Sequence, residues 1–123
     1  MRIKTADLIG PALDWAVAKC EEDAEHLSFS AYNGGLAYFK NQHLYCGEGW
    51  FNPSTNWAQG GPIIDRNGIA TERKIIEGTT EHEWKAYVPY IHAYGPTPLI
   101  AAMRCYVASK LGDEVEVPDA LLS

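Results

Sequence analysis

The sequence predicts an α+β domain: an N-terminal helix, a small, mostly antiparallel β-sheet with long loops, and a C-terminal helix packed on that sheet. Three observations predict it. First, an apolar stripe at helical spacing follows Pro11. Second, segments 69–76 and 83–88 have the pattern of a β-hairpin. Third, residues 97–112 carry helix signals at both ends. At 123 residues the chain has the length of one domain, so we expect a single domain over 1–123, with an extended tail at 113–123.

The N-terminal helix is predicted in two parts. Thr5 is a candidate N-cap with Asp7 in the first turn, but Gly10-Pro11 interrupts this start, and Pro11 can open the main helix. Trp15 lies roughly opposite the apolar stripe, so it is either covered by a later loop or exposed as a contact for a partner. The stripe comprises Leu13, Ala16, Val17 and Cys20, and Asp14, Lys19 and Glu22 lie off it.

The middle of the chain has the pattern of short strands between turns. Aromatic or β-branched runs at 36–39, 44–46 and 84–88 are separated by glycine-rich segments, and Pro89 should end the second strand of the hairpin. Segment 51–66 has too many turn formers for a regular element. We therefore predict a compact loop there, held by its own side chains and followed by a tight turn at Asn67-Gly68.

The C-terminal helix has the strongest signals. Thr97 is its candidate N-cap, Pro98 takes the first helical position and Gly112 stands at the C-terminal end. Its wide apolar face comprises Leu99, Ile100, Met103, Tyr106, Val107 and Leu111. The other side is nearly as apolar, which favours burial on both sides, either by the domain's own loops or by a second copy of the chain. For the second case we predict a homo-oligomer interface formed by Ala101, Arg104, Cys105 and Ala108.

Composition argues against several classes of protein. The formal net charge of −6 disfavours nucleic-acid binding, which depends on neutralising phosphates with Lys and Arg. No apolar run approaches the roughly 20 residues that a membrane helix needs, and Met1 to Thr5 is not followed by the apolar stretch of a secretion signal. The three widely spaced cysteines fit reduced thiols. We therefore expect a cytoplasmic protein that does not engage membranes.

Catalytic and metal sites lack a sequence signature. His43 and Cys46 have a ligand-like spacing, and Cys20, Cys105, His82 and His92 are the further candidates to complete such a site. Structural zinc sites draw their ligands from closely spaced pairs, and this chain has one such pair, in a strand-like run where the two side chains would point to opposite faces. No nucleophile or phosphate-binding motif is present. We predict no catalytic residue, metal or cofactor, and favour a binding protein over an enzyme.

The most distinctive candidate for binding is the predicted 54–66 loop. Its polar side chains offer directional donors and acceptors and Trp57 offers a stacking face, a mixture that suits a small polar ligand with an aromatic ring. In the alternative interpretation the polar residues only cap turns and Trp57 belongs to the core. The candidate ligand-binding residues are Ser54, Thr55, Asn56, Trp57, Asp65 and Arg66, together with Tyr94 ahead of the last helix.

Three blocks of the sequence resemble one known family. They are ALDWAVAKC at 12–20, PSTNWAQGGPIIDR at 53–66 and YGPTPLIAAMRCYVASKLG at 94–112. In this order they are similar to the NinX-like proteins of tailed phages and enterobacterial prophages, a family of unknown function. Where many members have S-T-D-W, this chain has Ser54-Thr55-Asn56-Trp57. The carboxylate is therefore missing, although Asn56 can still cap a turn.

A shorter similarity links the chain to phage anti-defence proteins that sequester cyclic nucleotide signals and inhibit Thoeris immunity. These also begin with a helix resembling A-L-x-x-A, which is followed by an aromatic-rich small sheet and a P-S-x-x-D-like segment near a Trp. The resemblance implies an oligomer without catalytic groups that binds its ligand between subunits. We therefore expect a non-enzymatic phage accessory protein of the host-cell cytoplasm that binds a small nucleotide-like molecule, with a host immune signal as a candidate. The alternative is a protein–protein interaction module that modulates a host or phage factor.

Overall fold

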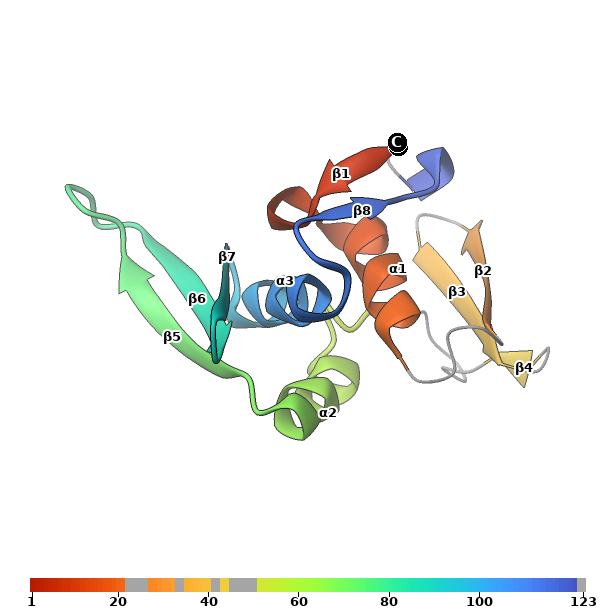
Figure 1. The fold of residues 1–123 in the computed structure, drawn as a ribbon, viewed down its shortest axis with the longest axis horizontal. Helices are drawn as coiled ribbons and strands as arrows, with labels where there is room; N and C mark the ends of the chain where they lie inside the picture. Colours follow the sequence, from red (N-terminus) through yellow and green to blue (C-terminus); the bar gives the residue numbers. More distant parts are fainter. Residues whose placement is uncertain (22–26, 33–34, 41–42, 45–50, 122–123) are drawn as a thin grey trace.

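The computed structural model describes residues 1–21, 27–32, 35–40, 43–44 and 51–121 (Figure 1). Over these residues the chain forms three α-helices, α1 (Gly10–Cys20), α2 (Trp57–Asn67) and α3 (Pro98–Leu111). Short 3₁₀ turns, η1 (Thr5–Asp7) and η3 (Asp119–Leu121), lie near the two ends of the chain. The α+β class predicted from the sequence is confirmed.

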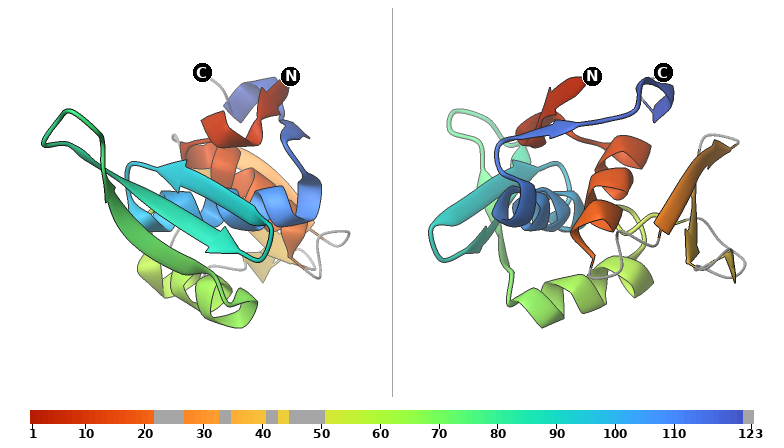
Figure 2. Two further views of the ribbon diagram at one scale, coloured as in Figure 1. Left: turned by 60° about the vertical axis from the view of Figure 1, so that its left-hand side comes forward. Right: turned by 45° about the vertical axis from the view of Figure 1, so that its right-hand side comes forward.

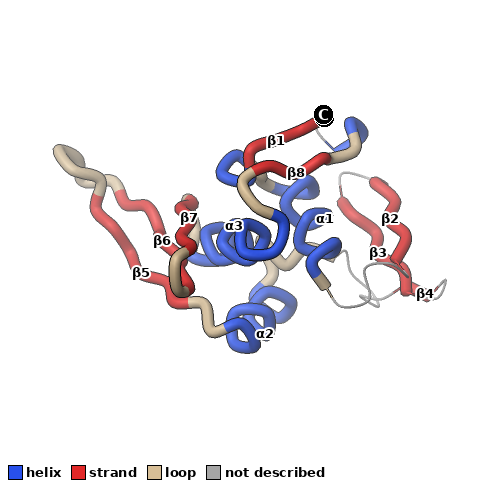
Figure 3. Tube along the Cα trace, viewed as in Figure 1, coloured by secondary structure: helices blue, strands red, loops and turns tan. Residues whose placement is uncertain are grey.

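Within the described residues the strands form three separate antiparallel sheets rather than the single small sheet that the sequence predicted (Figure 3). The first pairs β1 (Arg2–Lys4) with β8 (Glu114–Glu116). The second has the order β2 (Leu27–Tyr32), β3 (Gly35–Lys40) and β4 (His43–Leu44). The third has the order β5 (Ala70–Ile75), β6 (His82–Val88) and β7 (Ile91–Gly95).

The predicted hairpin is confirmed as β5 and β6, and β6 ends before Pro89 as expected. The next turn, Pro89-Tyr90, joins β6 to β7, with Val88 paired to Ile91. Tyr90 is fully exposed there, with a positive φ of 70°. Proline followed by a residue with positive φ is the pattern of a type II turn, which normally has Gly or Asn at the second position.

Helix α3 lies at the centre of the molecule (Figure 1). The β5–β7 sheet covers one side of it, as the left view of Figure 2 shows, and α1 and α2 pack on other sides. Both predicted caps are confirmed: the Thr97 hydroxyl accepts a hydrogen bond of 3.1 Å from the Ile100 N–H, and Gly112 ends the helix with its N–H donating to the Ala108 carbonyl. The predicted apolar face is buried except for Leu111.

The small-residue side of α3 packs against the sheet. Ala101 and Cys105 have no exposed surface, and the Cys105 sulfur lies 4.0 Å from the Ile91 carbonyl oxygen on β7. A Cβ on Gly95 of β7 would come within 2.8 Å of the Ala101 backbone nitrogen, so the two backbones approach closely. The prediction that Ala101 and Cys105 form an interface is therefore wrong, because their small side chains admit the chain's own sheet.

Segment 57–67, predicted as part of a loop, is the helix α2. Asn56 caps its start, since the side-chain oxygen accepts a hydrogen bond of 2.9 Å from the Ala58 N–H. Gly68 ends it in the left-handed conformation, so the expected tight turn at Asn67-Gly68 is the C-terminal end of a helix. Gly60 and Ile63 are buried, and packing on α3 offsets the low helix propensity of Gly60-Gly61-Pro62.

The N-terminal segment differs from prediction in two respects. Residues 5–7 form only a 3₁₀ turn, and the Thr5 hydroxyl donates to the Gly112 carbonyl oxygen at 2.6 Å instead of capping a helix. Helix α1 then starts at Gly10, with Pro11 in its first turn as expected. Asp14, predicted to lie off the buried stripe, is only 4% exposed.

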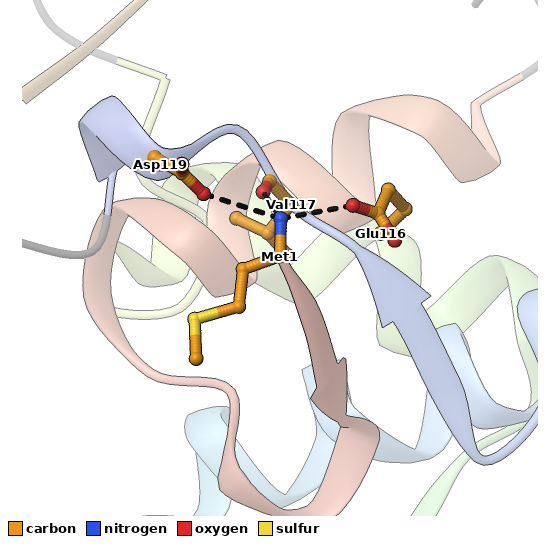
Figure 4. Close-up of polar contacts among 4 residues, drawn as sticks. All are labelled: Met1, Glu116, Val117 and Asp119. Carbon is orange, nitrogen blue, oxygen red and sulfur yellow. Dashed lines mark hydrogen bonds and ion pairs between the residues drawn. The ribbon is translucent and has the colours of Figure 1, made fainter.

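The two ends of the described chain lie side by side (Figure 4). The Met1 amine donates to Glu116 at 2.9 Å, to the Val117 carbonyl at 2.8 Å and to Asp119 at 3.2 Å. The carboxylates of Glu116 and Asp119 raise the pKa of the amine. The predicted extended tail is thus β8 over 114–116, followed by the turn η3. Over the described residues, none of the helices has the length and apolar character needed to cross a bilayer.

Candidate functional site

A groove of about 1010 Å³ runs beside the edge strand β7. Its volume is at the upper end of the range of small-molecule sites. Five segments that are distant in sequence line it. The first comprises Lys4 at the end of β1 and Thr5 and Ala6 in η1, and the second comprises Ile76, His82 and Glu83 near the tip of the β5–β6 hairpin. The others are residues 92–96 on and after β7, Arg104 and Ala108 on α3, and Asp113 just before β8 with Glu114 at its start.

Two rings of β7 form an aromatic border of the groove. His92 and Tyr94 are two residues apart on the strand and therefore project from the same face, away from α3. Their ring centroids are 5.6 Å apart at an interplanar angle of 80°, an edge-to-face contact. Tyr94 remains 41% exposed. The exposed Tyr94 ring offers a face on which a ring of a ligand can stack.

Arg104 supplies a fixed positive charge to the groove. Its Nε donates to the Leu8 carbonyl at 2.8 Å and its Nη1 donates to the Tyr94 carbonyl at 2.9 Å. These bonds tie α3 to the segment before α1 and to β7, which orients the guanidinium. Burial lowers the pKa of Arg104, and the negative charge of Asp7 opposes that effect. The side chain still lines the groove.

Charges of both signs surround the groove. Lys4 and Arg104 are positive, while Glu83, Asp113 and Glu114 are negative at neutral pH. Arg2 lies 3.5 Å from Glu114 and partly neutralises it. A site of this kind favours a ligand that has both an acidic group and hydrogen-bond donors.

The thiols and histidines do not assemble a reactive centre within the described part of the chain. Burial raises the pKa of Cys20 to about 12 and also raises that of Cys105, so neither is a ready thiolate nucleophile. Among the described residues no group of three or more His, Cys, Asp or Glu side chains could hold a metal ion. Of the two residues with ligand-like spacing, His43 lies on β4 and Cys46 lies outside the described residues.

Three of the predicted ligand-binding residues have structural roles at the start of α2. Ser54 is buried and its N–H donates to Asp14 at 2.9 Å. Asn56 is the N-cap of the helix, and the Thr55 hydroxyl lies 3.4 Å from the Asn52 carbonyl oxygen in the turn before it. Trp57 is different, because it is 55% exposed. The turn-capping interpretation therefore holds for the side chains of Asn56 and Thr55, whereas Ser54 bonds through its backbone N–H. The core interpretation of Trp57 is wrong.

Asp65 and Arg66 lie at the other end of α2. Asp65 is exposed, and Arg66 donates to Glu21 at 2.7 Å. Glu21 also accepts a hydrogen bond of 3.1 Å from the Tyr106 hydroxyl, so this group links all three helices. Nine residues of helix, about 13 Å, separate Arg66 from Trp57. Tyr94 lines the groove and no residue of 54–66 does, so the structure does not bring the predicted set into one site.

Asp14 anchors the turn that precedes α2. Burial raises the pKa of Asp14 to about 6, and the Ser54 N–H and hydroxyl act in the opposite direction. The Ser54 hydroxyl nevertheless forms no hydrogen bond of good geometry. The carboxylate is therefore part of the fold, and its position on α1 fixes where α2 begins.

Some residues that line the groove were predicted from the sequence as functional, but the sequence did not predict that they lie together. Tyr94 was a predicted ligand residue, and Arg104 and Ala108 were predicted interface residues. Lys4 and Glu83 had no sequence signal, because neither belongs to a motif. Only the pairing of β1 with β8 and the fold of the β5–β6 hairpin bring them to the same groove.

Two comparisons with known proteins bear on the identity of the chain. Residues 4–110 match the model of the family described as Bacteriophage P22, NinX. The matched region runs from the end of β1 almost to the end of α3 and so includes most residues of the groove. No curated protein matches the chain significantly.

Proposed function

Since the chain belongs to the phage NinX family and is a phage accessory protein, we propose that it binds a small nucleotide-like molecule in the groove beside β7 and catalyses no reaction on it. The observation that carries this proposal is the meeting of Tyr94 and Arg104 at one groove. An exposed ring beside a fixed cation suits a ligand with a base and an acidic group. The carboxylates of Glu83 and Asp113 suit its amino or hydroxyl groups.

Binding without turnover would remove such a molecule from solution. For a phage, the ligand whose removal brings an evident benefit is a nucleotide signal of host immunity, and this is our proposal for its identity. The same proposal assigns the protein to the host-cell cytoplasm. We also propose that the protein forms a homo-oligomer. Arg104 and Ala108 are the candidate interface residues that stay accessible, at the groove.

Isothermal titration calorimetry with a panel of cyclic and ADP-ribose-type nucleotides tests the proposal. A matched pair of variants locates the binding. Tyr94 and Tyr87 are each 41% exposed on neighbouring strands of one sheet, but only Tyr94 lines the groove. Tyr94→Ala should lower affinity about tenfold, by loss of stacking worth on the order of 1–3 kcal/mol per base, and Tyr87→Ala should leave it unchanged. Silence of the folded protein across the panel would refute the proposal.

A second candidate function is a protein–protein interaction module, and the exposure of Trp57 favours it. Tryptophan is enriched among residues that dominate binding energy at interfaces. Trp15, the other candidate anchor, is half-buried, and the Lys19 ammonium lies 4.8 Å from its ring centroid. Affinity purification from infected cells should recover one stoichiometric partner that is lost with Trp57→Ser and kept with Ala58→Ser. Recovery of the protein alone would exclude this candidate.

A further inference from the structure

Arg104 is a partly buried cation without an ion-pair partner among the described residues. Its two hydrogen bonds go to the uncharged carbonyl oxygens of Leu8 and Tyr94. Asp7 acts on it only through space, because no carboxylate of the described chain lies within 4.0 Å of the guanidinium. Charges that lose part of their hydration in a protein are usually paired, so a partly buried cation that faces a groove without an ion-pair partner is available to an anionic ligand.

The geometry of the guanidinium leaves donors for a ligand. Arginine has five N–H donors in a planar fork, and the two carbonyls use one on Nε and one on Nη1. The remaining donors, including both on Nη2, have no hydrogen-bond partner within the described residues. The two carbonyls hold the fork in place, so a ligand would meet a cation whose orientation is already fixed.

We propose that Arg104 forms a phosphate subsite of the groove, with Lys4 as its second cation. The proposal rests on the proposed function and deepens it, since it assigns the acidic group of the nucleotide-like ligand to a named residue. Arginine matches the geometry of phosphate oxygens, and a hydrogen bond between charged groups is roughly twice as strong as a neutral one. Lys4 lines the same groove and is exposed, so its ammonium can approach the same phosphate.

The rest of the groove limits the ligand class. Glu83 and Asp113 would repel a second phosphate but accept hydrogen bonds from hydroxyl or amino groups. A ligand with one phosphate, a sugar and a base that stacks on Tyr94 satisfies all of these groups. The ligand class is therefore a nucleotide with a single phosphate group rather than a polyphosphate.

Calorimetry with adenosine 5′-monophosphate, adenosine and inorganic phosphate separates the subsite from the proposed function. The wild-type protein should bind the monophosphate at least about tenfold more tightly than adenosine, as expected for a charge-assisted hydrogen bond. Arg104→Gln should remove this preference. Lys110→Gln, which removes an exposed cation of α3 outside the groove, should keep it.

The outcomes are distinguishable. Equal affinity for adenosine and its monophosphate would overturn the subsite and leave the proposed function intact. Phosphate-induced shifts of groove resonances in NMR spectra, without binding of either adenosine compound, would support the subsite and count against a nucleotide ligand. Silence of all three compounds would overturn the subsite, and the panel of cyclic and ADP-ribose-type nucleotides would then decide the proposed function separately.

Loss of the bonds to Leu8 and Tyr94 can unfold Arg104→Gln, so thermal unfolding of this variant is measured first. Lys4→Gln is the second variant, at an exposed side chain. It should weaken binding of the monophosphate by about threefold without changing adenosine binding, in line with a modest exposed charge interaction. An unchanged monophosphate affinity in Lys4→Gln would remove Lys4 from the subsite.

Discussion

A carboxylate oxygen of Asp14 on α1 accepts a hydrogen bond of 2.9 Å from the backbone N–H of Ser54, forty positions later in the chain. The exposed fractions are 4% for Asp14 and 1% for Ser54, so this bond is shielded from water. It satisfies a backbone donor in the turn before α2, a group that would be costly to bury without a partner.

Stability should depend on the protonation of Asp14. Burial raises its pKa from 3.8 to about 6, so folding favours the protonated form. The contribution of protonated Asp14 to the free energy of unfolding is fully present below pH 3.8 and is lost as the pH rises through about 6. The free energy of unfolding should fall by about 3 kcal/mol over this range. Asp14→Asn should remove this part of the pH dependence in urea unfolding at pH 4.5, 6 and 7.5. Asp65→Asn, at an exposed carboxylate, is the control, and identical pH profiles for wild type and Asp14→Asn would contradict the prediction.

The two adjacent glycines of α2 should respond oppositely to alanine. A Cβ on Gly60 would lie 2.5 Å from Leu99 Cδ1 and 2.5 Å from the Pro53 carbonyl oxygen, whereas one on Gly61 would meet nothing within 4 Å. Gly60→Ala should lower the free energy of unfolding by about 1–3 kcal/mol through overpacking. Gly61→Ala should raise it by up to about 1 kcal/mol through helix propensity. Chemical denaturation measures both, and equal effects would argue against the packing of α2 on α3.

The cap of α2 should tolerate a carboxylate. Asn56→Ala removes the oxygen that accepts from the Ala58 N–H and should cost about 1 kcal/mol of stability. Asn56→Asp keeps that acceptor and adds a negative charge at the positive end of the helix, so its stability should equal or exceed that of the wild type. Thermal unfolding of the three proteins provides the measurement. A destabilisation by Asp as large as that by Ala would show that the cap does not act through its side-chain oxygen.

Substitution of two alanines of α3 by glutamate tests which of them lies in the core and which lies at the surface. Ala101 is buried against β7, so Ala101→Glu should bury an unpaired charge and abolish folding. Ala108 is half-exposed at the groove, and Ala108→Glu should leave a folded protein. Circular dichroism reports folding, and light scattering of wild type and Ala108→Glu reports oligomeric state. If the wild type is an oligomer and Ala108→Glu has the same mass, the groove side of α3 is not its interface.

Replacing Tyr90 by asparagine should make the protein more stable. Its φ of 70° is unfavourable for a residue with a Cβ, and its exposed side chain has little packing to lose. Tyr90→Asn should raise the unfolding free energy by a few tenths to about 1 kcal/mol, because asparagine tolerates this conformation better. Tyr87→Asn on the adjacent strand should show no such gain. A loss of stability in Tyr90→Asn would mean that the ring makes favourable contacts in solution.

Elements with local signals were predictable from the sequence. The Thr97, Pro98 and Gly112 signals act within the helix they delimit, and the β5–β6 hairpin joins neighbouring segments. Helix α2 was missed because Gly60-Gly61-Pro62 weakens helix propensity, while the contact that favours glycine, the close approach of Gly60 to Leu99, involves a residue thirty-nine positions away. Strand β1 has three residues, too few for a recognisable period, and its partner is at the other end of the chain.

The site was harder to predict than the fold. Tyr94 and Arg104 were each singled out, but in different roles, because nothing in the sequence shows that Arg104 donates to the Tyr94 carbonyl. The 54–66 segment looked like a ligand loop because Ser, Asn and Gly serve equally well as binding groups, caps and close-packing residues. Burial and hydrogen-bond partners, which are tertiary properties, separate these roles.

The pairing of β1 with β8 has a mechanical consequence. Arg2 pairs with Glu116 and Lys4 with Glu114, so Met1 and Val117 lie at the same end of an antiparallel ladder. A force that pulls these two residues apart acts across the strands and breaks the rungs one after another, instead of shearing them all together. Pulling with optical tweezers on these two points should therefore open the β1–β8 ribbon at low force, before α3 and the β5–β7 sheet carry any load.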